Sequence, residues 1–429
     1  MISQTKIVII HIDTLRKEYL GSWLLGEILK KNGYKVLLTS RHSTKRLLNF
    51  FTPDIFICTH VFQLNASEWK KLVDRGIKIY ISESEGTDHE IGVSTTYPHE
   101  YAGQVIDYSV FSGIFVWGKF SYDWLIKNRN IDPQKVYLNG SIRQSTLCKP
   151  NRKKDSVVVG ILSRFEIINT FDKRHPFANL MSIDPENPAW SWYFERCAID
   201  SETFSIINKL ADILIAQGHL VSIRPHPNEN LEGYQLLKNK FGCSFSIDES
   251  YSINEWLSTV SVVLGTTSTA FTEPYIAKIP IISTSKIQHF HYSDADQAKL
   301  IQKFDMSAYT PASVSEAASL CIQLDLAPKS SVELDQYFKH FYTLDSPVDP
   351  IDRIVSVVDK DIQAGLHLSK LLGYFWATFI LLCLDILFLV IGTIRSRNLR
   401  SLGTLGIYNY NMLLHKPSLF MKNILKRLI

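Results

Sequence analysis

The sequence has no closely paired cysteines. Its six cysteines in 429 residues are scattered, without a CxxC pair: Cys58, Cys148, Cys197, Cys243, Cys321 and Cys383. This spacing argues against a structural zinc site and against a dense disulfide framework, and it is typical of a reducing compartment. A signal peptide is also missing, because the opening MISQTKIVIIHID has a single lysine and an apolar run that is too short and too polar at its end. We therefore expect the main body to stay in the cytoplasm.

Acidic residues are absent after Asp385. Seven basic residues follow it instead: Arg395, Arg397, Arg400, Lys416, Lys422, Lys426 and Arg427. The whole chain has 46 basic and 42 acidic residues, a net charge of +4, so the part without these seven has 39 basic and 42 acidic residues and a net charge of −3. We therefore expect no nucleic-acid binding by the main body and an affinity of the tail for an anionic surface.

Short apolar runs rich in β-forming residues recur in the first third of the chain. Segments with helical spacing lie between several of them, such as residues 19–33, which end at Gly33. Strands that are apolar throughout and alternate with helices are typical of a parallel sheet with helices on both faces. The runs cover residues 6–13, 35–40, 54–60, 77–84, 113–118 and 135–140.

A polar segment, residues 149–156, separates this series from a second one. We therefore predict an α/β protein of two doubly wound, Rossmann-like domains, residues 1–150 and 151–365, with a ligand in the cleft between them. Residues 169–197 are aromatic and irregular, and the sequence leaves open whether they line the ligand pocket or form a surface excursion. The strands of the second series cover residues 157–163, 219–225, 243–248, 260–266 and 279–284.

The last part, residues 366–429, is predicted to contain membrane-associated helices. Residues 371–394 are apolar except for Asp385, and their 24 positions reach about 36 Å at ~1.5 Å per residue, against ~30 Å for a bilayer core. This length favours a spanning helix. The positive charges on its carboxyl side and the missing export signal favour a re-entrant or interfacial helix, in which Asp385 finds a partner or water. A helix buried in the protein core is the third possibility.

The final segment, residues 417–429, predicts a basic amphipathic helix. Its apolar residues Met421, Ile424, Leu425 and Leu428 share one face, and its basic residues lie elsewhere. Such a helix is suited to a membrane surface, and packing against the main body is the alternative.

Two prolines enclose a histidine at the end of a predicted strand, in Arg224-Pro225-His226-Pro227. The prolines restrict the backbone and stop the strand. Doubly wound domains bind ligands at the carboxyl ends of their strands, and the N–H groups of arginine and histidine can donate to a phosphate. An ordinary turn with a surface histidine is the alternative. A second His-Pro pair, at His175, follows no predicted strand and is the weaker candidate.

A turn rich in hydroxyl groups ends another strand of the same half. Thr266, Thr267, Ser268 and Thr269 precede a predicted helix that contains Glu273. Such a turn presents backbone and hydroxyl donors at the positive end of a helix, where a phosphate is favoured, and ordinary helix capping is the alternative. Because we expect the two motifs to end neighbouring strands, we predict one shared nucleotide site.

Acidic residues follow a strand in the first half of the chain. Glu83, Glu85 and Gly86 end the run 77–84 on the side expected to face the cleft. Two neighbouring carboxylates could raise the pKa of one of them and produce a general base for a sugar hydroxyl. A solvated acidic loop is the alternative.

These motifs, in this order, resemble those of a known set of enzymes. ESEG at 83–86, RPHP at 224–227 and TSTAFTEPYIAKIPII at 267–282 are similar to the acidic-acidic-glycine, His-Pro and Ser/Thr motifs of GT-B glycosyltransferases that use CMP-activated sugars. That set includes bacterial sialyltransferases, polysialyltransferases and capsule Kdo transferases. Residues 116–125 and 136–144 also resemble the end of the first domain in these enzymes, so the resemblance covers roughly residues 1–330.

The resemblance implies roles for individual residues. His226 would contact the phosphate of the donor nucleotide, and Ser268 and Thr269 would hold the same phosphate. Glu85 matches the second acidic position of the motif, whereas Ser84 replaces the first, so the base is either Glu85 or Glu83. No convincing DxD motif is present, which agrees with a metal-independent GT-B mechanism without a cofactor.

The implied function is that of an inverting glycosyltransferase. It would move a sugar from a nucleotide-activated donor, a CMP-sugar, to a glycan or glycolipid acceptor of a surface polysaccharide or lipopolysaccharide, at the cytoplasmic face of the bacterial inner membrane. Three alternatives are a CDP-polyol phosphotransferase of the teichoic-acid type, a non-catalytic membrane-tethered protein that binds nucleotide sugars, and a sugar-nucleotide epimerase, which the tail disfavours. The predicted donor-binding residues are Arg224, His226, Thr267, Ser268, Thr269 and Glu273.

Overall fold

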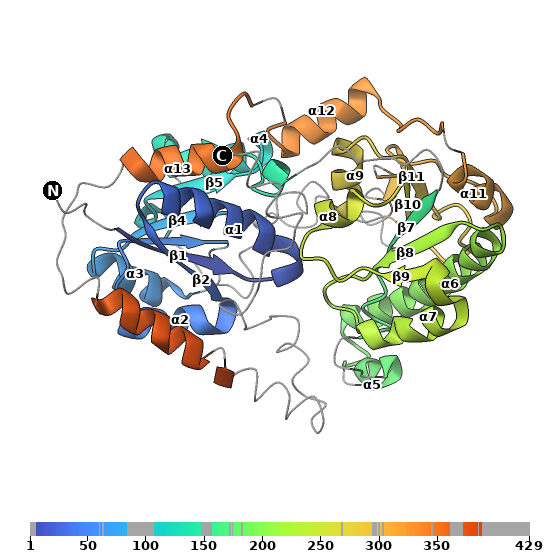
Figure 1. Ribbon diagram of the computed structural model, residues 1–429, viewed down its shortest axis with the longest axis horizontal. Helices are drawn as coiled ribbons and strands as arrows, with labels where there is room; N and C mark the ends of the chain where they lie inside the picture. The colour runs from blue at the N-terminus through green and yellow to red at the C-terminus, as the bar shows by residue number, and fades with distance from the viewer. Residues whose placement is uncertain are drawn as a thin grey trace.

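A computed structural model shows two α/β domains, each built on one parallel sheet (Figure 1). It describes residues 6–83, 107–146, 157–360 and 372–387, except for residues 60, 62–63, 130, 171–172, 174, 182, 267–268, 294–297, 299–300, 303, 324, 345 and 385.

Within the described residues, the first domain contains a six-stranded sheet in the order β2-β1-β3-β4-β5-β6, in which every pair of neighbours is parallel. Its strands are almost entirely buried, because helices cover both faces. This confirms the predicted doubly wound sheet. The strands are β1 (Ile7–Ile12), β2 (Lys35–Ser40), β3 (Ile55–Cys58), β4 (Lys78–Ser82), β5 (Gly113–Val116) and β6 (Val136–Leu138).

Two sets of helices cover this sheet. One face carries α1 (Leu15–Lys31) and α13 (Pro350–Lys360), and the other carries α2 (Arg41–Phe50), α3 (Ala66–Asp74) and α4 (Lys119–Arg129). Helix α1 ends as predicted just before Gly33, whose φ of +88 lies in the left-handed region that glycine adopts readily.

Helix α13 lies on the first domain, although it follows the second domain in the chain. Ile351, Ile354, Val355 and Val358 form its buried stripe and pack in the same core as α1. The predicted range of the second domain, 151–365, therefore includes a helix that covers the first sheet. An apolar stripe predicts that a helix is packed, but it does not say against which sheet.

The second domain contains a five-stranded parallel sheet within the described residues, in the order β11-β10-β7-β8-β9. Its strands are β7 (Val158–Leu162), β8 (Leu220–Arg224), β9 (Phe245–Ile247), β10 (Val262–Gly265) and β11 (Ile281–Ser283). One face packs on α6 (Pro188–Ala216), α7 (Gln235–Phe241) and α11 (Val314–Cys321), and the other on α8 (Ile253–Leu257), α9 (Thr272–Ile276) and α12 (Val332–Phe341).

The segment predicted to be aromatic and irregular is partly helical. It contains α5 (Pro176–Leu180), and its last residues form the first turns of α6, the longest of the described helices. These turns bring Arg196, Ile199 and Asp200 to the carboxyl edge of the second sheet, where they line a pocket.

The two domains meet at a close junction. Trp117, which follows β5, packs in one core with Phe341 of α12. A Cβ atom on the neighbouring Gly118 would lie 2.3 Å from the carbonyl carbon of Phe341, so only glycine allows this approach. The side-chain amide of Asn254 in α8 donates to the carbonyl oxygen of Arg143 in the first domain at 2.9 Å.

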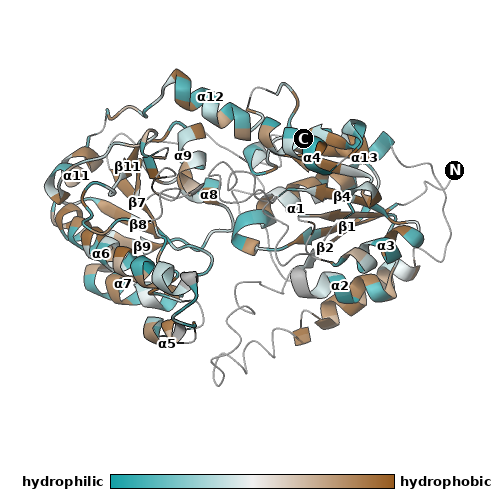
Figure 2. Ribbon diagram, turned by 180° about the vertical axis from the view of Figure 1, so that it is seen from behind, coloured by the Kyte–Doolittle hydropathy of each residue, from teal (hydrophilic) through white to brown (hydrophobic). Residues whose placement is uncertain are grey.

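Residues 372–384 and 386–387, named here the C-terminal helix, are helical and lie on the first domain beside α2 and α3 (Figures 1 and 2). Ala377 and Leu381 are fully buried, and Ala377 belongs to the core of the α2 and α3 face. Among the described residues, no helix combines the length and the apolar character needed to cross a membrane. Asp385 and the predicted amphipathic helix at 417–429 lie outside the described residues.

Candidate functional site

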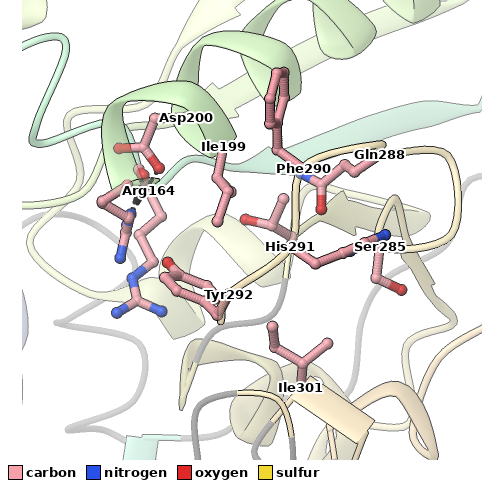
Figure 3. Close-up of a pocket in the computed structure, with 11 residues that line it drawn as sticks. Arg164, Ile199, Asp200, Ser285, Gln288, Phe290, His291, Tyr292 and Ile301 are labelled. Atoms are coloured by element: carbon pink, nitrogen blue, oxygen red, sulfur yellow. Dashed lines mark hydrogen bonds and ion pairs between the residues drawn. The ribbon is translucent and has the colours of Figure 1, made fainter. Parts of the chain in front are cut away.

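The carboxyl edge of the second sheet carries a cluster of charged and polar side chains. Because all strands of the sheet are parallel, the residues that follow β7, β8, β10 and β11 meet at one edge. Residues that follow β7, β10 and β11, together with residues of α6, line a pocket at this edge (Figure 3). The pocket is lined by Arg164, Arg196, Ile199, Asp200, Thr266, Ser285, Gln288, Phe290, His291, Tyr292 and Ile301.

The sheet order corrects one expectation. The His226 turn and the hydroxyl-rich turn follow β8 and β10, which are not neighbours, because β7 lies between them. Crossover connections allow strands that are consecutive in sequence to be separated in space. The loop after β7, with Arg164 and Glu166, therefore occupies the centre of the edge.

The backbone of the His226 turn is held by a buried carboxylate, that of Glu229. The Ser163 hydroxyl donates to Glu229 Oε2 at 2.6 Å, and the Tyr234 hydroxyl donates to the same oxygen at 2.5 Å. The backbone N–H of His226 also donates to this oxygen, at 3.2 Å, and that of Phe165 donates to Oε1. Burial raises the pKa of Glu229 to about 7, against these hydrogen bonds. Glu229 thus joins the loops after β7 and β8.

The imidazole of His226 is partly open, with 39% of its side chain exposed. The backbone N–H of Asn228 donates to its Nδ1 at 3.3 Å, which favours the neutral tautomer with the proton on Nε2. Burial lowers the pKa of His226, and Arg164 adds to this effect while Glu166 opposes it. A neutral imidazole with Nε2–H can donate one hydrogen bond to an anionic ligand.

A network of charges surrounds the same loop. Nδ1 of His226 lies 3.9 Å from Glu166 Oε2, and Nε of Arg164 lies 3.9 Å from Glu166 Oε1. Arg196 of α6 pairs with Asp200 at 2.7 Å and with Glu166 at 3.4 Å. Burial disfavours the charge on Glu166, but His226, Arg196 and Arg164 outweigh it and lower its pKa. Arg164 and Arg196 of this network line the pocket, whereas His226 does not and is connected to them through Glu166.

Arg164 and Arg196 were missed by the sequence reasoning. Arg164 follows β7 directly, so the rule that selected His226 could also have selected it. Arg196 stands four residues before Asp200 in α6, a spacing that suits an ion pair on a helix but does not point to a pocket.

Arg224 has a different environment from the one expected. Its guanidinium is buried and donates to the carboxylate of Asp248, to the Ser250 hydroxyl at 2.9 Å and to the carbonyl oxygen of Arg16 at 3.2 Å. Arg16 belongs to α1, so Arg224 connects the two domains, and it does not line the pocket. A donor-binding role for Arg224 stays a prediction.

The hydroxyl-rich turn is described only in part. Thr266 lines the pocket. Thr267 and Ser268 lie outside the described residues, and for Thr269 only the backbone is described, at the start of a short 3-10 helix. Their roles in donor binding stay predictions.

Glu273, in the first turn of α9, lies at the domain junction. Its carboxylate pairs with Nη1 of Arg143 in the first domain at 3.2 Å, and both side chains are largely buried. The Arg143 guanidinium in turn lies over the Trp117 ring, 4.8 Å from its centroid. As a donor-binding residue Glu273 remains a prediction, and the structure adds its contact with the first domain.

Of the two candidate bases, Glu83 is described and Glu85 is not. Glu83 follows β4 and is 3% exposed. The indole N–H of Trp117 donates to the carbonyl oxygen of Glu83 at 2.7 Å, and the backbone N–H of Trp117 donates to Glu83 Oε2 at 3.3 Å. Burial raises the pKa of Glu83 to about 8, against the hydrogen bonds from Trp117 and Ser121. Glu83 therefore holds a proton near neutral pH.

The rival His-Pro pair has no comparable surroundings. The backbone N–H of Phe177 donates to Nδ1 of the exposed His175 at 3.2 Å, at the start of α5. His175 does not line the pocket. Within the described part of the chain, no group of three or more His, Cys, Asp or Glu side chains is arranged to hold a metal ion.

Comparisons with known proteins bear on the fold. No family model matches the chain, and no curated protein matches it. A variant of the wall teichoic acid polymerase TagF matches with a TM-score of 0.53 and 12% identity over 83% of this chain and 88% of that one. A form of TagF soaked with CDPG gives a TM-score of 0.51, also with 12% identity over 83% and 88%.

A weaker match has a TM-score of 0.47. It is the UDP-GlcNAc 2-epimerase from Methanocaldococcus jannaschii in complex with UDP-GlcNAc and UDP, with 12% identity over 83% of this chain and 99% of that one. At 12% identity the two TagF matches concern the fold alone, and with the two observed sheets they show a GT-B architecture.

Proposed function

We propose that the protein is a glycosyltransferase that moves a sugar from a nucleotide-activated donor, a CMP-sugar, to a glycan or glycolipid acceptor. The observation that carries this proposal is the arrangement of Arg164, His226 and Arg196 at the carboxyl edge of the second sheet, beside a pocket with an aromatic ring and apolar side chains. Pre-positioned N–H donors suit a phosphate, and the apolar side chains suit a nucleobase.

The transfer would use residues of both domains. A carboxylate of the first domain, Glu83 or Glu85, would take the proton of an acceptor hydroxyl while its oxygen attacks the anomeric carbon of the donor sugar. The bond between that carbon and the phosphate oxygen breaks, with inversion, and the leaving phosphate gains negative charge. Arg164 and the Nε2–H of His226 would stabilise this charge. With its pKa raised to about 8, Glu83 is mostly protonated at neutral pH, so it can act as the base only in the fraction that is ionised, which grows as the pH approaches 8.

Two features of the proposal rest on the sequence. A metal-independent mechanism without a cofactor agrees with the lack of a DxD motif in a convincing loop. The location at the cytoplasmic face of a bacterial inner membrane, with a surface polysaccharide or lipopolysaccharide as the acceptor, follows from the apolar segment at 371–394 and the basic tail.

A second candidate function is the transfer of a polyol phosphate from a CDP-activated donor. It is supported by the match with TagF, a wall teichoic acid polymerase, in a form soaked with CDPG. The two candidates differ in the bond that is formed. Both reactions release CMP, so the two candidates are separated by the product: a glycosyltransferase forms a glycosidic bond, whereas a phosphotransferase forms a phosphodiester.

The test is nucleotide binding by the detergent-solubilised full-length protein, measured by calorimetry with CMP, CDP, UDP and GDP. We expect CMP to bind and His226→Ala to weaken this binding by about tenfold, the loss of one charge-assisted hydrogen bond. Binding of UDP or GDP in place of CMP would overturn the donor class, and binding of no nucleotide would favour the non-catalytic alternative. Product analysis with CMP- and CDP-activated donors then separates the two transferases.

A further inference from the structure

The C-terminal helix is apolar on two opposite faces. Its inner face is packed on the first domain, where Ala377 is 1% exposed and Leu381 is 0% exposed. Tyr374 and Ile380 pack against the same core. A Cβ atom on Gly373 would lie 3.2 Å from the ring of Phe51, so this glycine lets the helix approach α2 closely. The helix is therefore a fixed part of the domain.

Its outer face is exposed and equally apolar. The exposed residues recur at helical spacing and form one stripe, named here the outer stripe: Leu372, Phe375, Trp376, Phe379, Cys383, Ile386 and Leu387. Their exposures include 60% for Phe375 and 64% for Trp376. The described residues of the helix include no charged side chain. Water is a poor solvent for such a surface, so it marks an interaction site.

The apolar surface also extends beyond the helix. Phe50, at the end of α2, is 76% exposed, and its neighbour Phe51 lies under the helix at Gly373. Figure 2 shows the helix beside α2 at the edge of the domain, with hydrophobic residues along its length.

The geometry favours a helix that lies flat on a membrane. One of its faces is already buried on the first domain, so only the outer stripe can meet lipid. Phenylalanine and tryptophan on one face of a helix are typical of interfacial binding.

The charge of the following chain identifies the kind of surface. Arg395 is eight residues beyond Leu387, and the remaining chain carries seven basic residues and no acidic one. Basic residues next to an apolar face complement anionic lipid headgroups. In a symmetric dimer through the same stripe, two such segments would lie near each other and repel.

We propose that the outer stripe inserts into the headgroup region of an anionic bilayer and holds the first domain flat against it. The inference rests on the proposed function in one respect. Membrane binding would bring the acceptor side of the cleft to an amphiphilic acceptor. For the described residues 372–384 and 386–387, the inference favours the interfacial helix among the three possibilities.

The test is flotation of the full-length protein, after removal of detergent, with vesicles of phosphatidylcholine alone or with about one-third phosphatidylglycerol. We expect binding to the anionic vesicles, and a loss of at least about tenfold in the double variant Phe375→Ser/Trp376→Ser. The matched control is Phe177→Ser on α5, which removes an equally exposed ring, 62%, from the other domain and should bind like the wild type.

A second readout uses two exposed cysteines. Cys383 lies on the outer stripe and Cys243 lies in the second domain. Anionic vesicles should slow the reaction of Cys383 with a maleimide and leave that of Cys243 unchanged. CMP binding, measured on every variant, shows that each one is folded and tests the proposed function independently.

Several outcomes would overturn the proposal. One is equal flotation of the double variant and the wild type, which would assign membrane binding to the basic tail alone. Another is a dimer in the absence of vesicles that the double variant abolishes, which would make a second copy the occupant of the stripe. The proposal would also be excluded if the wild type bound neither kind of vesicle.

Discussion

The Ser163 hydroxyl donates a hydrogen bond of 2.6 Å to the buried carboxylate of Glu229. Ser163 follows β7 and Glu229 follows β8, so this contact joins the two loops that carry Arg164 and His226. The prolines on either side of His226 stiffen the turn, but it is Glu229 that sets its position relative to the neighbouring loop.

We expect Glu229→Gln to weaken CMP binding and to lower the free energy of unfolding by about 1–3 kcal/mol. An amide presents an N–H₂ group to donors that need an acceptor, so at least one buried partner would lose its hydrogen bond. Urea unfolding and calorimetry measure the two effects. Glu232→Gln is the matched control, because its side chain is 75% exposed and forms a surface ion pair with Lys173. Equal behaviour of the two variants would contradict the role of Glu229.

Glu83 should make stability depend on pH. Its pKa is raised from 4.5 to about 8 by burial, so the folded protein keeps a proton that the unfolded chain releases. The stability from this group is fully present below about pH 4.5 and is lost as the pH rises through about 8. We expect the wild type to lose roughly 4 kcal/mol more than Glu83→Gln between about pH 5 and about pH 9, measured by urea unfolding. Parallel curves for the two proteins would show that Glu83 titrates normally.

Arg164 should contribute more to nucleotide binding than an arginine outside the pocket does. We expect Arg164→Ala to raise the Kd for CMP by about 10- to 100-fold and Arg164→Lys to recover only part of the loss, because lysine does not offer two parallel N–H groups. Arg129→Ala, at the end of α4 in the first domain, is the control. An unchanged Kd in Arg164→Ala would move the phosphate site away from the loop after β7.

The ion pair between Arg143 and Glu273 should couple the two domains. Removing one partner leaves the other buried charge unpaired, so we expect Arg143→Met to lower the free energy of unfolding by about 3 kcal/mol. The double variant Arg143→Met/Glu273→Gln should be more stable than either single variant. A double-mutant cycle by urea unfolding measures the coupling energy between Arg143 and Glu273. Strictly additive losses of stability would mean that their contact of 3.2 Å contributes no coupling energy.

Much of the fold could be predicted from the sequence because it depends on local patterns. Strands that are apolar throughout and alternate with helices predict parallel sheets, and Gly33 marked the end of α1. The sequence also pointed to the His226 turn and to the hydroxyl-rich turn that begins at Thr266, and both lie at the carboxyl edge of the second sheet. It missed Arg164 because the strand order was not known, and the loop after β7 was therefore not recognised as the centre of that edge.

By itself, the sequence determined which segments are strands and helices, that they form two α/β domains, and that the end of the chain is apolar and then purely basic. These properties follow from side-chain periodicity and charge, which are local. Only the tertiary structure decided that β7 separates β8 from β10, that Arg224 connects the domains, and that α13 and the C-terminal helix return to the first domain. Those facts depend on contacts between residues far apart in the chain, where an apolar stripe or a charge specifies that a partner is needed but not which one.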